Sequence, residues 1–249
     1  MTKAARLIRA AKPGDAVAWH ERIASRFDAR YREGKRFKER FRVWSELIRD
    51  HCEPGMDAVD LGCGSGVFTA LLAARARRVY AIDGSAAMLA ITRRHLSGQG
   101  LRNVEVVESR LEAFLDNTGP EFDLAVCSSV VEYLDHPDEF LDSCRDALKP
   151  GGILLISMPN GASWYRALEA WAFALTGFPR YYGCVKSIIP PETWVKRLHN
   201  RGFDIVEYRF FGAAPIISWP MRLIGLTQYS DTMIVFAARK RGLSKTASA

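Results

Sequence analysis

A glycine-rich stretch at residues 59–68, VDLGCGSGVF, is the part of the sequence best suited to bind a ligand. It places Gly62, Gly64 and Gly66 at alternate positions, directly after an apolar run that contains Asp60. Glycines let the backbone approach a ligand closely, and a helix that follows such a loop offers free N–H groups. We therefore expect this loop to bind a nucleotide-like molecule.

The spacing of the glycines separates this loop from two common nucleotide-binding motifs. A dinucleotide loop reads G-x-G-x-x-G, but Val67 stands where its third glycine would be, and a P-loop needs a lysine that is absent here. Asp60 instead suits a cationic ligand group. Asp83 ends the next apolar run, about 20 residues on, where an acid pairs with ribose hydroxyls. An adenosine ribose joined to a cationic amino acid fits both acids, as in S-adenosylmethionine.

The segments around the loop predict a sheet that is covered by helices on both faces. Short apolar runs alternate with helical patterns, as in repeated βαβ units. Nearly continuous apolar strands indicate burial on both sides. We expect an α/β fold: a Rossmann-like doubly wound, mostly parallel seven-stranded sheet with N-terminal helices and an apolar lid insertion after strand five. The expected strands are 57–62, 78–83, 104–109, 122–129, 151–159, 203–212 and 232–240, with helices at 19–34, 35–51, 66–76, 85–97, 137–150 and 191–202.

The length of 249 residues predicts one substantial α/β domain over 1–249. Changes in composition along the chain divide this domain into shorter parts. These parts are a basic arm (1–14), N-terminal helices (15–52), a cofactor-binding core (53–160), a lid insertion (161–190), C-terminal strands (191–240) and a basic tail (241–249).

Together these motifs resemble those of the class I S-adenosylmethionine-dependent methyltransferases, over roughly residues 16–160. VDLGCGSG matches the first motif of that family, AIDGSAAML the second, and LKPGG the turn before the fifth strand. Where the family often has an acid near the adenine, this chain has Ser109. The resemblance implies S-adenosylmethionine as cofactor, bound by Asp60, Gly62, Cys63, Gly64, Gly66, Asp83, Gly84, Met88, Ser109, Arg110, Leu111 and Ser128.

The segment after the fourth strand, SSVVEYLDHP, is expected to face the methyl acceptor. Methyl transfer requires an aligned nucleophile, and a hydroxyl nucleophile must also lose its proton. The segment is similar to that of ubiquinone-biosynthesis-type O-methyltransferases, which carry Glu-His where this chain has Glu132 and Tyr133. The nearest histidine is His136. We take these three residues as catalytic candidates; an exposed turn histidine and a helix-start acid are the structural alternatives.

Residues 161–190 form an unusually aromatic segment that breaks the alternation of strands and helices. Helical spacing places Trp164, Leu168, Trp171 and Leu175 on one face, with Arg166 and Glu169 elsewhere. The segment is either a lid packed on the sheet edge, a lid over a hydrophobic substrate, or an interfacial helix that touches lipid. The candidate substrate-binding residues are Tyr31, Trp164, Tyr165, Tyr181 and Tyr182.

Composition limits which cellular compartment and which binding partners are expected. The five cysteines are scattered without a C-x-x-C pair, which favours a reducing compartment and no metal site. No apolar run approaches the ~20 residues that span a bilayer. A cytoplasmic protein is expected, with peripheral membrane contact through 161–190 as an option. The net charge of +7 arises largely near the chain ends, and no nucleic-acid-binding module accompanies it.

The sequence thus predicts a methyltransferase that acts on a small hydrophobic or aromatic acceptor, with O-methylation as the first hypothesis. N-methylation of a small amine or a phospholipid headgroup is the alternative, since a free amine needs no base. An RNA or protein substrate is less favoured, because CSSV stands where an Asn-Pro-Pro-Tyr-type motif would follow the fourth strand. Nothing in the sequence indicates an oligomeric state.

Overall fold

The computed structural model describes residues 15–33, 35–119, 121–213 and 218–242, and within these ranges only the backbone of 25–33, 35–36 and 218–220. The predicted basic arm, 1–14, lies outside the described residues, as does most of the predicted tail, 243–249. Tyr31 lies within a helix, but its side chain is outside the description.

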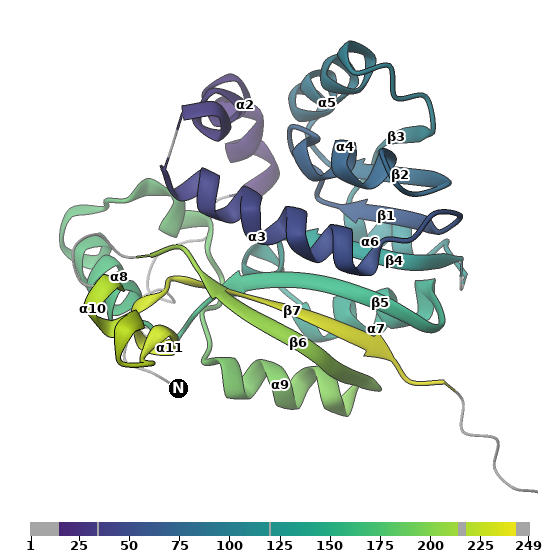
Figure 1. Cartoon of the computed structure of the whole chain (residues 1–249). Coiled ribbons are helices and arrows are strands. Elements are labelled where there is room, and N and C mark those ends of the chain that lie inside the picture. The colour runs from purple at the N-terminus through teal and green to yellow at the C-terminus, as the bar shows by residue number, and fades with distance from the viewer. Residues whose placement is uncertain (1–14, 34, 120, 214–217, 243–249) are drawn as a thin grey trace, which may run out of the picture.

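A seven-stranded sheet in the order β3-β2-β1-β4-β5-β7-β6 forms the centre of the described chain (Figure 1). The first five strands are parallel, and β7 runs antiparallel to both β5 and β6. This confirms the doubly wound, mostly parallel fold. Strand order reverses between β1 and β4, so a ligand crevice is expected at their carboxyl ends. The strands are β1 (Asp57–Leu61), β2 (Arg78–Asp83), β3 (Val104–Glu108), β4 (Phe122–Ser128), β5 (Leu148–Pro159), β6 (Phe203–Phe211) and β7 (Met233–Lys240).

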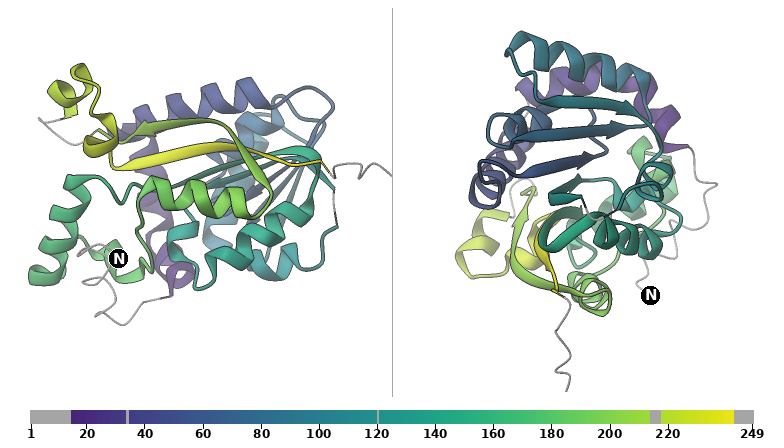
Figure 2. Two further views of the ribbon diagram at one scale, coloured as in Figure 1. Left: turned by 90° about the horizontal axis from the view of Figure 1, so that it is seen from below. Right: turned by 90° about the vertical axis from the view of Figure 1, so that its right-hand side faces the viewer.

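Helices cover both faces of the sheet, with α3 on one side and α7 and α9 on the other (Figure 2). The α-helices are α2 (Ala16–Glu33), α3 (Lys35–His51), α4 (Val67–Ala73), α5 (Ala86–Gly98), α6 (Leu111–Leu115), α7 (Pro137–Ala147), α8 (Trp164–Thr176), α9 (Pro191–Asn200), α10 (Ser218–Leu223) and α11 (Thr227–Ser230). Two 3-10 turns, η1 (Val131–Tyr133) and η2 (Arg180–Cys184), complete the order.

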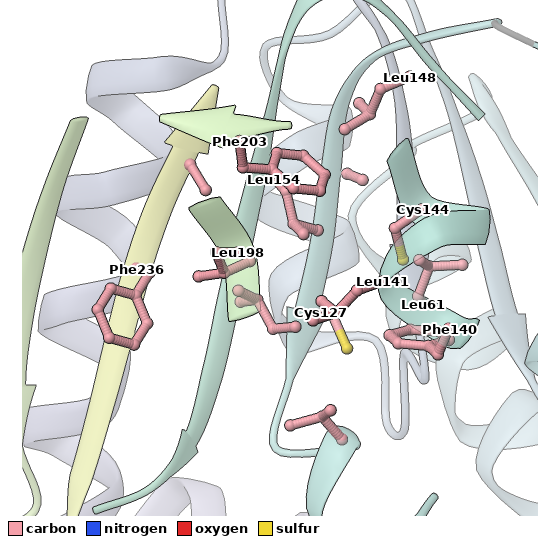
Figure 3. Packing of buried hydrophobic residues seen from close by; sticks show 14 of the residues in the cluster. Leu61, Cys127, Phe140, Leu141, Cys144, Leu148, Leu154, Leu198, Phe203 and Phe236 are labelled. Carbon is pink, nitrogen blue, oxygen red and sulfur yellow. The ribbon is translucent and has the colours of Figure 1, made fainter. Parts of the chain in front are cut away.

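The alternation of side chains along each strand divides the core into two layers. In β4, Leu124 packs with Trp44 of α3, whereas Cys127 packs on the opposite side with Phe140 of α7. The second of these layers is shown in Figure 3, where Leu198 of α9 joins the same cluster. Both layers are apolar, which explains why the strands read as continuous apolar runs rather than alternating ones.

The fifth strand begins earlier than predicted. The sequence LKPGG predicted a turn before residue 151, but β5 already extends from Leu148. A register shift in its pairing with β4, between Phe122 and Leu124, accommodates these residues within the strand. The difference lies at the sheet end remote from the glycine loop and does not affect the site.

Helix α8 turns its apolar stripe away from the protein. Trp171 and Leu175 are 60% and 65% exposed, while Arg166 and Glu169 on the opposite face are largely covered. On the covered face, Arg166 donates to Glu169 and to the hydroxyl of Tyr181, with Nη1–O distances of 3.0 and 2.5 Å. The same face packs Ala170 and Phe173 against the apolar cluster of Tyr182, Val185 and Ile188. The polar pairing and this apolar contact together fix the orientation of α8.

Candidate active site

A cavity of about 480 Å³ lies at the carboxyl ends of β1, β2 and β4, within the size range of small-molecule sites. It is where strand order reverses, as the fold predicts. All the predicted cofactor residues except Gly66 line it. The lining set is Asp60, Gly62, Cys63, Gly64, Asp83, Gly84, Met88, Ser109, Arg110, Leu111 and Ser128.

The glycine loop is held against the end of β2 by backbone hydrogen bonds. The amides of Gly62 and Cys63 both donate to the carbonyl of Ile82, at 2.8 and 2.9 Å. A side chain at position 62 would place its Cβ 2.4 Å from a methyl of Val130, so the close approach of these two segments requires glycine. The loop therefore keeps its backbone, rather than side chains, at the cavity wall.

Asp83 links the loop to the next helix. Its two carboxylate oxygens accept the amides of Gly64 and Ser85, each at 2.9 Å. Burial raises the pKa of Asp83, while the two backbone donors act in the opposite direction. An acid at this strand end, on the cavity wall, is placed to accept hydrogen bonds from ribose hydroxyls.

Asp60 is the more deeply buried acid. Its carboxylate accepts the hydroxyl of Thr69 at 2.6 Å, and burial raises its pKa to about 7. The neighbouring charge of Asp83 raises that pKa further, and Arg40 lowers it. A cationic ligand group beside this carboxyl would favour the ionised form and gain a charge-assisted contact.

Arg40 is a cavity residue that sequence analysis missed. It comes from α3, and its Nη2 donates to the hydroxyl and carbonyl oxygens of Ser128 at 2.6 and 3.1 Å. The sequence around it, KRFKERFR, contains several cations that look alike. Its position one helical turn before the buried Trp44 was the available signal, because that spacing places both on the covered face of the helix.

Among the three catalytic candidates, Tyr133 alone lines the cavity. Glu132 is buried beside it but outside the lining, and its Oε2 has no hydrogen-bond partner among the described residues. Burial raises the pKa of Glu132 to about 7. The side chain of His136 is 73% exposed and lies 3.6 Å from the carboxylate of Glu139. The tight turn at η1 sends these neighbouring side chains in different directions, so the structure does not bring them together.

The candidate substrate residues of 161–190 lie outside the cavity lining. Tyr181 and Tyr182 instead donate their hydroxyls to Glu169 at 3.1 and 3.4 Å. The rings of Trp164 and Tyr165 meet edge to face at 6.0 Å. A role for these four residues in binding the acceptor thus remains a prediction, and their contacts in the structure hold the insertion in place.

The described part of the chain holds no group of three or more His, Cys, Asp or Glu side chains arranged to bind a metal ion. None of its helices combines the length and the apolar character needed to cross a membrane.

The fold and the cavity together define a class. A doubly wound sheet with antiparallel β7 next to β5, a D-x-G-x-G-x-G loop on the cavity wall and an acid at the end of β2 is the arrangement of class I S-adenosylmethionine-dependent methyltransferases. The cavity fits this cofactor, since it offers a glycine cradle, two acids and a cation.

Comparisons with known proteins agree with this class. A family model described as a methyltransferase domain matches residues 31–208. Ubiquinone biosynthesis O-methyltransferases from Azoarcus sp. (strain BH72) and Methylococcus capsulatus are 28% and 30% identical, over 79% and 69% of this chain and 84% and 73% of theirs. The structure of the N-methyltransferase NodS from Bradyrhizobium japonicum WM9, in complex with S-adenosyl-L-homocysteine, superimposes with a TM-score of 0.66 at 18% identity, covering 91% of this chain and 99% of that one.

The chain therefore belongs to the class I S-adenosylmethionine-dependent methyltransferase family, and it is an enzyme that uses S-adenosylmethionine.

Proposed function

We propose that this methyltransferase transfers the methyl group to an oxygen of a small hydrophobic or aromatic acceptor. The observation that carries the proposal is the mixed lining of the cavity. The glycine loop, Asp60 and Asp83 line it together with Val130, Tyr133 and Leu134. The polar groups suit the cofactor, and the apolar and aromatic side chains suit the acceptor. The relatives named as ubiquinone biosynthesis O-methyltransferases support oxygen as the acceptor atom.

In this proposal, different residues on the cavity wall bind different groups of the cofactor. Bound S-adenosylmethionine supplies an electrophilic methyl group on a positively charged sulfur. Asp83 holds the ribose, and Asp60 with the loop holds the ammonium end. Arg40 holds the carboxylate of the cofactor, because it is the cation nearest to Ser128 and Asp60 on that wall. Ser109, Arg110 and Leu111 surround the adenine.

Mass spectrometry of reaction products tests the acceptor class. The purified enzyme is incubated with S-adenosylmethionine and a panel of catechols, hydroxylated quinone precursors and amines. We expect methyl ethers from the phenolic members, and calorimetric binding of S-adenosylmethionine with a Kd below about 1 mM. Products methylated only on nitrogen would replace this proposal with N-methylation of a small amine or a phospholipid headgroup. A cofactor that binds without any product would reject the acceptor classes and leave the family assignment intact.

We also propose that the outer face of α8 contacts an anionic membrane surface. Leu168, Trp171 and Leu175 are exposed on this helix, and Phe178 follows them. In addition, α10 and α11 lie at the same end of the molecule (Figure 1), where Leu223, Ile224, Leu226 and Tyr229 are exposed. Exposed Arg180 beside the helix, with a net charge of +7 for the chain, favours an anionic partner. A helix with an apolar face and a cation at its edge suits a membrane surface, because the apolar side chains can enter the acyl chains while the cation stays among the headgroups.

Vesicle sedimentation tests this contact with a double substitution, Trp171→Ser with Leu175→Ser. Each apolar side chain moved out of lipid costs about 1.5–3 kcal/mol, so binding to phosphatidylcholine vesicles with phosphatidylglycerol should fall at least tenfold. Val206→Ser is the control, because Val206 is also an exposed apolar side chain (45%) but lies on β6. Absence of vesicle binding by the unaltered enzyme, or an equal loss in the control, would refute the contact.

A further inference from the structure

Transfer to a hydroxyl requires a proton acceptor, and none of the catalytic candidates taken from the sequence fills that place well. Burial raises the pKa of the Tyr133 hydroxyl above its ordinary range, so this residue stays protonated. The carboxyl group of Glu132 is buried outside the cavity lining. His136 is largely exposed on the loop before α7. The base must therefore be sought among the other residues that line the cavity.

His20 of α2 lines the same cavity as Tyr133. The two rings meet edge to face, with centroids 5.5 Å apart and planes inclined by 77°. On the other side, Trp19 packs edge to face on the imidazole at 4.8 Å. The imidazole thus stands next to the aromatic residue that replaces the histidine of the Glu-His pair in the similar O-methyltransferases.

The tautomer of His20 follows from its backbone contact. Nδ1 lies 2.8 Å from the carbonyl oxygen of Ala16, one turn earlier in the helix. A carbonyl oxygen can only accept, so Nδ1 carries the proton and donates it. In the neutral ring the basic lone pair is then on Nε2, the nitrogen on the far side of the ring from Ala16.

The position of α2 over the cavity is fixed by the neighbour of His20 in the sequence. The carboxylate of Glu21 accepts the amide of Ala87 at 3.1 Å and the hydroxyl of Ser85, at the start of α5. Ser85 in turn donates its own amide to Asp83. The helix that carries His20 is therefore linked through Ser85 to Asp83.

The surroundings of His20 favour its neutral form. Burial lowers its pKa and is the largest influence, while the carbonyl of Ala16 and the charge of Asp83 act in the raising direction. A neutral imidazole in a cavity is able to take up a proton at neutral pH. The other titratable or charged groups on the cavity wall are Asp15, Arg40, Asp60, Cys63, Asp83, Arg110, Glu112, Tyr133, Asp135 and Lys186.

We propose that His20 is the general base of the reaction, supplied by the N-terminal helix in place of a histidine in the segment after β4; this rests on the proposed O-methylation. The acceptor hydroxyl gives its proton to Nε2 as its oxygen forms the bond to the methyl carbon. The bond between that carbon and sulfur breaks, and its electron pair stays on sulfur, which becomes neutral. The imidazolium then releases the proton to water.

The test compares His20→Gln and His20→Ala with the unaltered enzyme, using the best acceptor from the product panel. General-base removal should lower kcat about 10²–10⁴-fold, with the Kd for S-adenosylmethionine changed less than about threefold. The base must be unprotonated, so activity should fall as the pH drops through a value below about 6.5, and this acidic limb should vanish in His20→Gln. Added imidazole should restore part of the activity of His20→Ala. His199→Gln, on the exposed side of α9, is the control.

The results distinguish a base role for His20 from a base at His136 and from N-methylation. Retained kcat, a retained acidic limb, or a loss explained by weaker S-adenosylmethionine binding would overturn the base role of His20. A loss of kcat in His136→Gln, with kcat retained in His20→Gln, would assign the base to the loop before α7. Identification of the product separates the two levels of the proposal: an N-methylated product overturns the O-methylation and the base together, whereas an ether formed equally well by His20→Gln overturns only the base.

Discussion

Replacing Asp83 with alanine should raise the Kd for S-adenosylmethionine at least about 100-fold, which corresponds to about 2.7 kcal/mol. Two effects combine at this position. The carboxylate accepts two backbone amides, from Gly64 and Ser85, and thereby holds the loop in its cavity-lining conformation. In the proposed cofactor site it also accepts hydrogen bonds from the ribose hydroxyls, and a hydrogen bond to a charged group contributes about 1.5–3 kcal/mol.

Calorimetric titration of Asp83→Ala and Asp83→Asn separates these two effects. The asparagine side chain keeps one acceptor oxygen, so it should retain one of the backbone contacts and show an intermediate Kd. Asp204→Ala is the matched control, since Asp204 is an exposed acid on β6 that pairs with Arg241, far from the cavity. Unchanged binding in Asp83→Ala would remove Asp83 from the site and contradict the cofactor position proposed here.

The part of the cavity proposed to bind the cofactor could be predicted as one cluster because it is built from short, local pieces of chain. The loop after β1 and the acid at the end of β2 are each read within a few residues, and a parallel sheet places both at one edge. A backbone hydrogen bond from Gly62 to Ile82 then holds the loop against the end of β2. Local motifs of this kind keep their geometry in any chain that forms the sheet.

The rest of the proposed site was less predictable because it is assembled from segments that are distant in the sequence. His20, proposed to act on the acceptor, and Arg40, proposed to hold the carboxylate of the cofactor, come from helices whose sequences show only amphipathic stripes. A stripe does not tell which residues reach a cavity. For α8 the periodicity grouped Trp164, Leu168, Trp171 and Leu175 on one face, but it could not tell that the last three point outward while Trp164 is half-buried. That orientation depends on the pairing of Arg166 with Tyr181 and on the packing of Ala170 and Phe173 against residues 182–188, which the local spacing does not reveal.

Gly66→Ala should lower the free energy of unfolding by about 2–5 kcal/mol and impair cofactor binding. Gly66 precedes α4 with φ of +77°, a conformation that costs other residues roughly 1–2 kcal/mol. An added Cβ would also lie 2.7 Å from Cγ2 and 2.9 Å from Oγ1 of Thr92. Thr92 is fully buried and β-branched, so it cannot rotate away freely, and overpacking of this kind costs about 1–3 kcal/mol. The same hydroxyl donates to the carbonyl of Gly64 at 2.8 Å, so displacing it disturbs the loop.

Denaturant unfolding of a small set of variants separates two causes of the destabilisation, the backbone strain at residue 66 and the steric clash with Thr92. Gly100→Ala is the matched control, because Gly100 has a similar φ of +68° but nothing within 4 Å of the added Cβ, so it should lose only the backbone part. Thr92→Ala in the Gly66→Ala background removes the colliding atoms and should recover about 1 kcal/mol or more relative to the sum of the single changes. Equal losses for Gly66→Ala and Gly100→Ala, with no coupling to Thr92, would show that backbone strain alone explains the glycine. The predicted coupling instead means that α5, through Thr92, shapes the glycine loop of the proposed cofactor site.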